Sequence, residues 1–187
     1  MCADCFAKIR YNESLDLVSG ELDGVVSAVV YNGVIRKLIR QFKYKPYVSG
    51  LSEIISEILN EGLVQSEGFY KFIKRYNPVA VPIPLSAKRF RERGYNHAEI
   101  IASYVAKYFR LPISNKLLVR IKDTKPQYRL NKNERKKNIE GAFSVHANPN
   151  SLYPEQSRRA NTPKAVIIID DLATSLTTLK EAAKVLK

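Results

Sequence analysis

Residues 164–178 read KAVIIIDDLATSLTT, and this stretch decides the fold class that we expect for the chain. The segment Lys164–Asp171 is dominated by an unbroken, β-branched apolar run, which is typical of a strand. Because no polar side chain interrupts the run, we expect both faces of the strand to be buried, as in parallel sheets covered by helices. Apolar residues then recur at helical spacing, namely Leu179, Ala182, Ala183 and Leu186. The stretch therefore predicts a strand, a turn and a helix.

The remainder of the chain alternates in the same way between short apolar strands and helical patterns. Further strands are predicted over Gly24–Tyr31, Pro78–Leu85, Leu117–Arg120 and Ala142–Val145. Helices are predicted over Val34–Phe42, from Leu51 to an end near Gly62, and over Ala98–Phe109. The polar segment 147–163 is predicted to be a surface loop. This order predicts an α/β fold with a mostly parallel sheet flanked by helices, occupying residues 25–187 behind an N-terminal segment of residues 1–24.

The charge of the chain is unbalanced. Lysine and arginine total 31 against 18 acidic residues, which gives a net charge of +13. Such an excess favours nucleic acid or phosphate-rich small ligands as partners, although a basic surface that only aids solubility is the alternative. No apolar run is long enough to span a membrane, and no secretory h-region follows the first five residues. We therefore expect a cytoplasmic protein without a membrane span.

The only two cysteines, Cys2 and Cys5, form a single C-x-x-C pair. A structural Zn²⁺ site normally needs four ligands, so one pair supplies half of a site. The histidines, His97 and His146, lie far away in other predicted elements. The pair is therefore interpreted as a partial zinc knuckle, with two free thiols as the alternative.

The turn after the strand at 164–171 has the chemistry of a sugar-phosphate site. Ligands of open α/β sheets bind at the carboxyl ends of strands. There, Asp170 and Asp171 can accept hydrogen bonds from two ribose hydroxyls or approach a metal ion. The hydroxyl-rich turn that follows offers N–H groups, hydroxyls and the positive end of a helix dipole to a phosphate. The alternative is a plain turn in which Thr174 or Ser175 serves only as a helix N-cap.

Residues 170–179, DDLATSLTTL, resemble the phosphoribosyl pyrophosphate signature of type I phosphoribosyltransferases, in which two acidic residues precede a Thr-Thr-Gly-x-Thr loop. Over about residues 25–187 the chain is similar to the competence protein ComF family. That likeness is carried by Tyr31, Arg36, Lys43, Val81–Leu85, Arg93–Asn96, Arg120, Thr124, Gln127, Arg135, Asn138 and Gly141–Phe143. The pair Cys2-x-x-Cys5 is similar to the second half of the four-cysteine zinc element of that family.

The resemblance implies a ligand and a set of roles. Asp170 and Asp171 would hold the ribose 2- and 3-hydroxyls of phosphoribosyl pyrophosphate, with Mg²⁺ shared by the pyrophosphate. The 5-phosphate would lie in the turn formed by Thr174, Ser175, Leu176, Thr177 and Thr178. The segment Pro82–Arg93 would bind the pyrophosphate, with three candidate cations, Lys88, Arg89 and Arg93. An arginine-rich solvated loop is the alternative for that segment.

The basic stretch from Arg120 to Asn138 would form a mobile hood that excludes water from the site. Its candidate contacts to the ligand or to nucleic acid are Arg120, Gln127, Arg135, Lys136 and Lys137. Aromatic and basic residues interleave at Gln127–Arg129, which is typical of a segment that stacks on unpaired bases. A hinge turn is the alternative there.

The chain departs from the family pattern in two places. Leu176 stands where the signature has glycine, and a left-handed backbone at a leucine costs about 1–2 kcal/mol. Charge-assisted hydrogen bonds to a phosphate contribute about 1.5–3 kcal/mol each, so strain alone would not abolish binding, whereas a side chain directed into the phosphate would. The family pattern also continues through a further strand, so we expect the last strand to be missing here.

These expectations lead to two functions on one fold. The first is a phosphoribosyltransferase that uses phosphoribosyl pyrophosphate and Mg²⁺. The second, also implied by the resemblance, is a non-catalytic protein that binds single-stranded DNA and works with the DNA-uptake machinery of natural competence. A degenerate copy that binds neither ligand is the third alternative.

Overall fold

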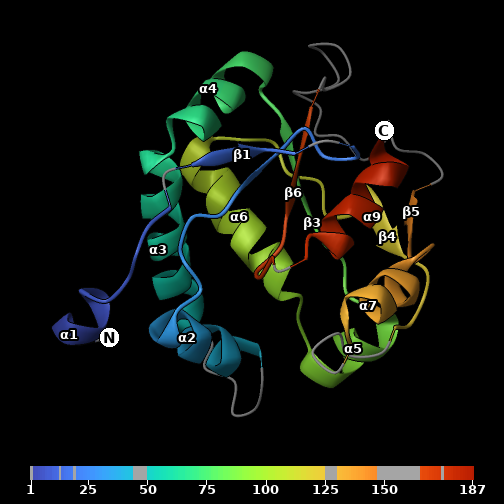
Figure 1. Ribbon diagram of the computed structural model, residues 1–187, viewed down its shortest axis with the longest axis horizontal. Helices are drawn as coiled ribbons and strands as arrows, with labels where there is room; N and C mark the ends of the chain where they lie inside the picture. Colours follow the sequence, from blue (N-terminus) through green and yellow to red (C-terminus); the bar gives the residue numbers. More distant parts are fainter. Residues whose placement is uncertain are drawn as a thin grey trace.

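The computed structural model describes residues 2–12, 14–18, 20–43, 50–124, 130–146, 165–173 and 175–187 of the chain. Helices and short strands mix along it, which confirms a mixed α/β class (Figure 1). In chain order the elements are α1 (Ala3–Phe6), β1 (Leu15–Leu17), β2 (Gly24–Val26), α2 (Gly33–Lys43), α3 (Leu51–Gln65), α4 (Glu67–Tyr76), β3 (Val79–Pro82), α5 (Ala87–Arg93), α6 (His97–Phe109), β4 (Leu118–Arg120), α7 (Lys132–Ile139), β5 (Phe143–Val145), β6 (Val166–Ile169) and α9 (Thr177–Leu186).

A parallel pair, β3 and β6, lies at the centre of the molecule (Figure 1). Ile113 extends it with a parallel bridge to Ala80 on the other side of β3. Because β3 has a neighbour on each side, its residues are buried, with Val79 and Val81 at 0% exposure. The residues of β6 are only half-buried, so the expected burial of both its faces is wrong. Among the described residues β6 pairs with β3 alone, which leaves its other edge less covered.

The other strands form two antiparallel ribbons. β1 pairs with β2, and β4 pairs with β5. The predicted strands at Leu117–Arg120 and Ala142–Val145 are therefore present, but they pair with each other and not with β3 or β6 in the described structure. The long strand predicted over Gly24–Tyr31 is shorter, because only β2 and a bridge from Val29 to Tyr11 are regular.

Helices α3 and α4 differ from the sequence-based predictions. α3 continues past its expected end at Gly62 and stops at Gln65. Gly62 is needed inside the helix because a Cβ there would lie 2.1 Å from the carbonyl oxygen of Ala28, so the backbone after β2 packs directly on α3. α4 was not expected from the sequence. It starts where the Ser66 hydroxyl accepts a hydrogen bond from an amide of its first turn, and it ends at Asn77, whose φ is 41°.

The apolar side chains form two clusters. The first lies among α2, α3, α4 and α6, with Phe42 and Ile101 at its centre. Ile9 from the N-terminal segment packs in this cluster too, while the division between residues 1–24 and 25–187 stays a prediction. The second cluster joins β3, β4, β5 and α9 through residues such as Val81 and Phe143. No helix within the described ranges is both long and apolar enough to cross a membrane.

Candidate functional site

The carboxyl ends of β3 and β6 bring two predicted site segments together. The register places Pro82 beside Ile169, and the Ile83 amide donates to the Ile169 carbonyl oxygen at 2.9 Å. The chain leaves β3 into the segment expected to bind pyrophosphate, and it leaves β6 into Asp170–Asp171. Because the strands are parallel, both segments begin at the same edge, as ligand sites of α/β sheets require.

The two aspartates carry different charges. Lys43, the last residue of α2, places its Nζ 2.6 Å from Oδ2 of Asp171, and the two side chains are 19% and 8% exposed. Burial and then the neighbouring negative charge of Asp171 raise the pKa of Asp170 to about 8. Burial also acts to raise the pKa of Asp171, but the Lys43 charge and a hydrogen bond with Asp170 lower it. At neutral pH the pair therefore holds one proton, on Asp170.

The position of Lys43 is fixed by the residue before it. The carbonyl oxygen of Phe42 accepts hydrogen bonds from the Tyr95 hydroxyl and from Nε2 of His97, both at 2.8 Å. Arg93 donates from Nη1 to Nδ1 of His97 at 3.4 Å. Burial, reinforced by the Arg93 charge, lowers the pKa of His97 to about 4, so the ring is neutral with its proton on Nε2. His97, to which the sequence assigns no catalytic role, thus holds the end of α2 against Asp171.

Two predicted cations meet at Thr124. Arg120 donates to the hydroxyl of Thr124, and Arg89 donates from Nη2 to the Thr124 carbonyl oxygen at 3.4 Å. The guanidinium of Arg120 also lies over the Phe143 ring, 5.5 Å from its centroid. Burial and the Arg89 charge lower the pKa of Arg120 to about 10, against the opposing attraction of Asp170. A cation of the expected hood and one of the expected pyrophosphate segment are therefore brought together at Thr124.

The turn between β6 and α9 is left-handed at Leu176. Its φ is 56°, it occupies the N-cap position, and no side chain caps this helix end. Ser175 is therefore not the N-cap, and its hydroxyl is instead hydrogen-bonded to that of Thr177 at 2.6 Å. The Leu176 side chain packs against the second apolar cluster. The backbone strain expected at the glycine position is thus present, and the side chain lies on the core.

The remaining predicted residues lie further from the dyad or outside the described structure. Thr174 and Gln127, with the neighbouring Tyr128 and Arg129, fall outside the described residues. Thr178 is half-buried in the first turn of α9. Residues 87–93 form the helix α5 and not a loop, and Lys88 is exposed on it, so binding of pyrophosphate by these cations stays a prediction.

The expected hood contains a helix, α7, which carries the other predicted hood cations. The side chain of Asn131 and that of Glu134 cap its start reciprocally. Lys136 and Lys137 are exposed on it, while Arg135 donates from Nε to the Leu130 carbonyl oxygen at 2.9 Å. The helical propensity of this polar stretch was hidden by its lack of an apolar face, and the capping pair is the signal that could have revealed it.

Cys5 lies on α1 and Cys2 directly precedes this helix, away from the aspartates (Figure 1). Hydrogen bonds from the backbone and side chain of Cys5 lower the pKa of Cys2, and the same side-chain bond raises that of Cys5. Within the described ranges no third histidine, cysteine, aspartate or glutamate joins the pair. Zinc binding therefore stays a prediction, and it would require further ligands.

Comparison with known proteins gives relatives of one kind. The chain is 30% identical over 107 residues to competence protein F of Haemophilus influenzae, covering 57% of this chain and 43% of the relative. It is 28% identical over 187 residues to competence protein ComFC of Bacillus subtilis, covering 100% of this chain and 65% of the relative. These relatives support assigning the chain to the ComF family.

The ComF relationship extends to the DNA utilization protein YhgH of Escherichia coli, 26% identical over 106 residues, or 57% of this chain and 41% of the relative. The chain spans less than two thirds of the length of each of these relatives. No family model matches the chain, and no solved structure gives a significant match.

Proposed function

We propose that this ComF protein binds phosphoribosyl pyrophosphate on a phosphoribosyltransferase-like domain and serves DNA uptake. The observation that carries the ligand is the aspartate pair at the end of β6, followed by a left-handed turn into the start of α9. This arrangement supports binding of a ribose through its two hydroxyls and of its 5-phosphate through the turn. The names of the relatives, two competence proteins and a DNA utilization protein, support the cellular role.

The different charges of the aspartates suit a ribose diol. Asp171, ionised beside Lys43, would accept a hydrogen bond from one hydroxyl. Asp170, which holds a proton, can donate as well as accept. The hydroxyls of Ser175 and Thr177 and the first amides of α9 would then face the 5-phosphate. The ligand would thus be recognised at both ends of its sugar.

Carboxylate oxygens are ligands that Mg²⁺ prefers, so the dyad fits the expected cation chemically. Lys43 already neutralises Asp171, and an indirect approach of Mg²⁺ through the pyrophosphate therefore fits better than direct ligation by this carboxylate. When bound with the ligand, Mg²⁺ would neutralise charge on the leaving pyrophosphate.

A transferase reaction would break the bond between C1 of the ribose and the pyrophosphate oxygen. The bonding pair would leave with pyrophosphate, and a nucleophilic acceptor would form the new bond to C1. Arg89, Arg93 and Lys88 are the cations proposed to stabilise the leaving group. Arg120 on the expected hood would help to exclude water, the competing nucleophile.

Calorimetric titration with phosphoribosyl pyrophosphate tests the ligand site. We expect Mg²⁺-dependent binding by the wild-type protein. In Asp171→Ala the affinity should fall by about 100-fold or more, because hydrogen bonds to a charged group are lost. Asp171→Asn keeps the shape of the side chain, and Asp16→Ala, at an exposed position on β1, is the matched control. Thermal melts confirm that each variant is folded. If the folded wild-type protein does not bind the ligand, the catalytic proposal is withdrawn.

The second candidate is a non-catalytic protein that binds single-stranded DNA. The net charge of +13 and the exposed lysines of α7 favour it. Its affinity for single strands should fall with salt and should weaken when Arg135, Lys136 and Lys137 are neutralised. Binding of DNA without phosphoribosyl pyrophosphate would select this candidate, whereas binding of neither would indicate a degenerate copy.

A further inference from the structure

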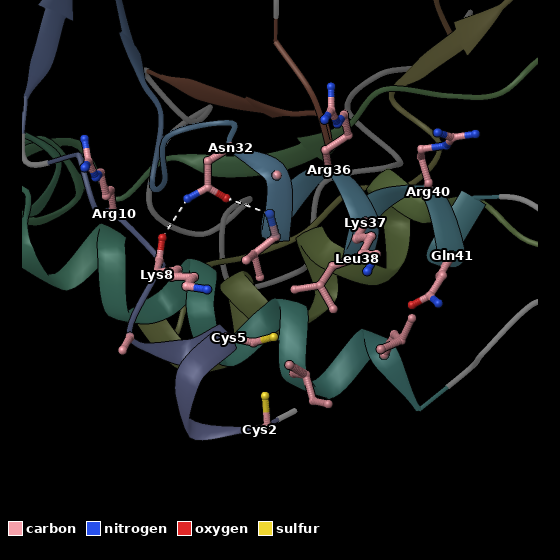
Figure 2. A pocket seen from close by; sticks show the side chains of 15 residues that line it. Cys2, Cys5, Lys8, Arg10, Asn32, Arg36, Lys37, Leu38, Arg40 and Gln41 are labelled. Atoms are coloured by element: carbon pink, nitrogen blue, oxygen red, sulfur yellow. Dashed lines mark hydrogen bonds between the residues drawn. The ribbon is translucent and has the colours of Figure 1, made fainter.

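A second charged region lies between α1, α2 and the start of α3, and none of the dyad residues lines it. It is a groove with a volume of about 1100 Å³ (Figure 2). Among the residues that the structure describes, no acidic residue lines it and five cationic residues do: Lys8, Arg10, Arg36, Lys37 and Arg40. We call these residues and the hollow between them the α2 groove.

The five cations of the α2 groove are exposed, and no described ion pair neutralises any of them. Lys8 on one wall and Lys37 on the other line the same hollow as Cys5. Like charges held close together repel each other, so their arrangement is favourable only in the presence of counterions or an anionic partner.

Hydrogen bonds join the walls of the groove. Asn32 donates from Nδ2 to the Lys8 carbonyl oxygen at 2.7 Å, and its Oδ1 accepts from the Val34 amide at 3.0 Å (Figure 2). One side chain therefore ties the N-terminal segment to the start of α2. The amide of Val30 donates to the Arg10 carbonyl oxygen at 2.8 Å, which fixes the backbone of a second cation.

The charged and apolar parts of the groove are separated. Figure 2 shows Arg10, Arg36 and Arg40 along one rim, with the cysteines on the opposite side. Arg36 and Arg40 are one helical turn apart, a rise of about 6 Å. The larger aliphatic lining residues are Val34, Leu38, Leu51 and Ile54, and none of the described lining residues is aromatic. The rim thus offers spaced positive charges, and the described apolar surface is aliphatic.

We propose that the α2 groove binds the sugar-phosphate backbone of single-stranded nucleic acid. Several spaced cations match a chain of phosphates better than one compact phosphate group. The aliphatic surface could contact sugars and unpaired bases, which a duplex keeps inside its stack. Because the charged side chains of the described lining are all cations, which contact phosphates and not base edges, we expect binding that does not depend on sequence. This proposal rests on the DNA-related part of the proposed function and not on the dyad.

Matched triple variants test the groove. Arg36→Gln, Lys37→Gln and Arg40→Gln together remove three of its charges. The control combines Lys71→Gln, Lys74→Gln and Arg75→Gln, which removes the same number of cations from α4, where none of them lines the groove. The probe is a fluorescent oligothymidylate of about 20 nucleotides, titrated at several salt concentrations. Thermal melts verify folding of both variants.

We expect the groove variant to bind the probe about 10-fold or more weakly, with the slope of log K against log salt reduced by about 2 for three lost contacts. The control should stay within about threefold of wild type, since only the long-range field changes. Equal losses in both variants, or no loss in the groove variant, would overturn the proposal. Because Asp170 and Asp171 are untouched, phosphoribosyl pyrophosphate binding in the groove variant is scored separately.

Alkylation of the thiols gives an independent measurement. Both cysteines of the chain line the groove, so their reaction with iodoacetamide reports its occupancy without engineered labels. We expect the oligothymidylate to slow alkylation of Cys2 and Cys5 in the wild type and not in the groove variant. A duplex of the same length and inorganic tripolyphosphate should protect less. Unchanged alkylation at saturating oligonucleotide, or equal protection by either comparison ligand, would contradict the proposal.

Discussion

The aspartate dyad and the α2 groove carry charge in opposite ways. At the dyad, Lys43 and Asp171 are largely buried and 2.6 Å apart, and every charge has a near partner of opposite sign. In the groove, five cations are exposed and the described part of the lining contains no acidic residue. The first arrangement is expensive to desolvate but holds a fixed geometry. The second leaves its charges hydrated, with no fixed partner.

The contrast indicates two kinds of recognition. A buried, neutralised pair fixes the positions of its oxygen atoms, as a small ligand with defined hydroxyls requires. An exposed cationic surface gains its affinity from the release of counterions, which depends on salt and tolerates movement of the ligand. The two regions should therefore respond differently to the same kind of substitution.

The largest effect is expected from Lys43→Met, which leaves the Asp171 carboxylate without its cation. Removing one partner of a buried pair destabilises a protein by about 3 kcal/mol or more, because the remaining charge stays buried. The matched substitution Arg40→Met, on the same helix but exposed in the groove, should change stability by less than about 0.5 kcal/mol. Urea denaturation of both variants measures the difference.

A double variant sharpens that result. Lys43→Met combined with Asp171→Asn removes both charges and should recover most of the lost stability. If the two single effects simply add, the ion pair contributes nothing to the fold.

The effect expected from Asp170→Asn depends on pH. The pKa of Asp170 is raised from 3.8 to about 8 in the folded protein. From about pH 4 to about pH 8 the unfolded chain loses this proton while the folded chain keeps it, so the group makes stability fall as pH rises through that window. Below about pH 4 the folded and the unfolded chain both hold the proton, so Asp170 does not make stability depend on pH there. Asparagine does not titrate, so the variant should gain stability relative to wild type on going from about pH 5 to about pH 8.

The pH series is measured by urea denaturation of wild type and Asp170→Asn in buffers of equal ionic strength. Asp16→Asn, at an exposed position, serves as the control and should follow the wild type. A constant difference between Asp170→Asn and wild type across the series would show that the proton is not held on Asp170.

The smallest effect is expected from Leu176→Gly. Glycine relieves about 1 kcal/mol of left-handed strain but removes a side chain that packs on the second cluster, so the free energy of unfolding should change by less than about 1 kcal/mol. Because the leucine side chain lies on the core, affinity for phosphoribosyl pyrophosphate should change by less than about threefold. Calorimetry checks this, and a large gain in affinity would show that Leu176 obstructs the phosphate.

The sequence was sufficient to predict the helices and strands whose apolar residues form a clear run or a clear helical period. The run Val166–Ile169, the helix α6 and the turn before α9 were all expected, because an apolar run or an amphipathic pattern marks each one. α5 and α7 are short, polar helices, and their cap residues are a weaker signal than an apolar face. The antiparallel pairing of β4 with β5 depends on long-range register, which local patterns do not encode.

The site was only partly predictable for a similar reason. Asp170 and Asp171 stand in a recognisable local motif, so the sequence alone singles them out. Their partner Lys43 lies at the end of a distant helix, and only the three-dimensional path of the chain brings it there. The hydrogen bonds of His97 to Phe42 and Arg93 have no sequence signature either, because a buried polar network is defined by packing.

Helix α2 carries parts of both charged regions. Arg36, Lys37 and Arg40 line the groove, and Lys43 ends the same helix beside Asp171. The helix is 11 residues long, or about 16 Å, and short helices of this kind move as stiff rods. A displacement of α2 at the groove would therefore carry the lysine with it. By thermodynamic linkage, if a partner bound in the groove changes the affinity of the dyad for its ligand by some factor, that ligand changes the affinity of the groove by the same factor.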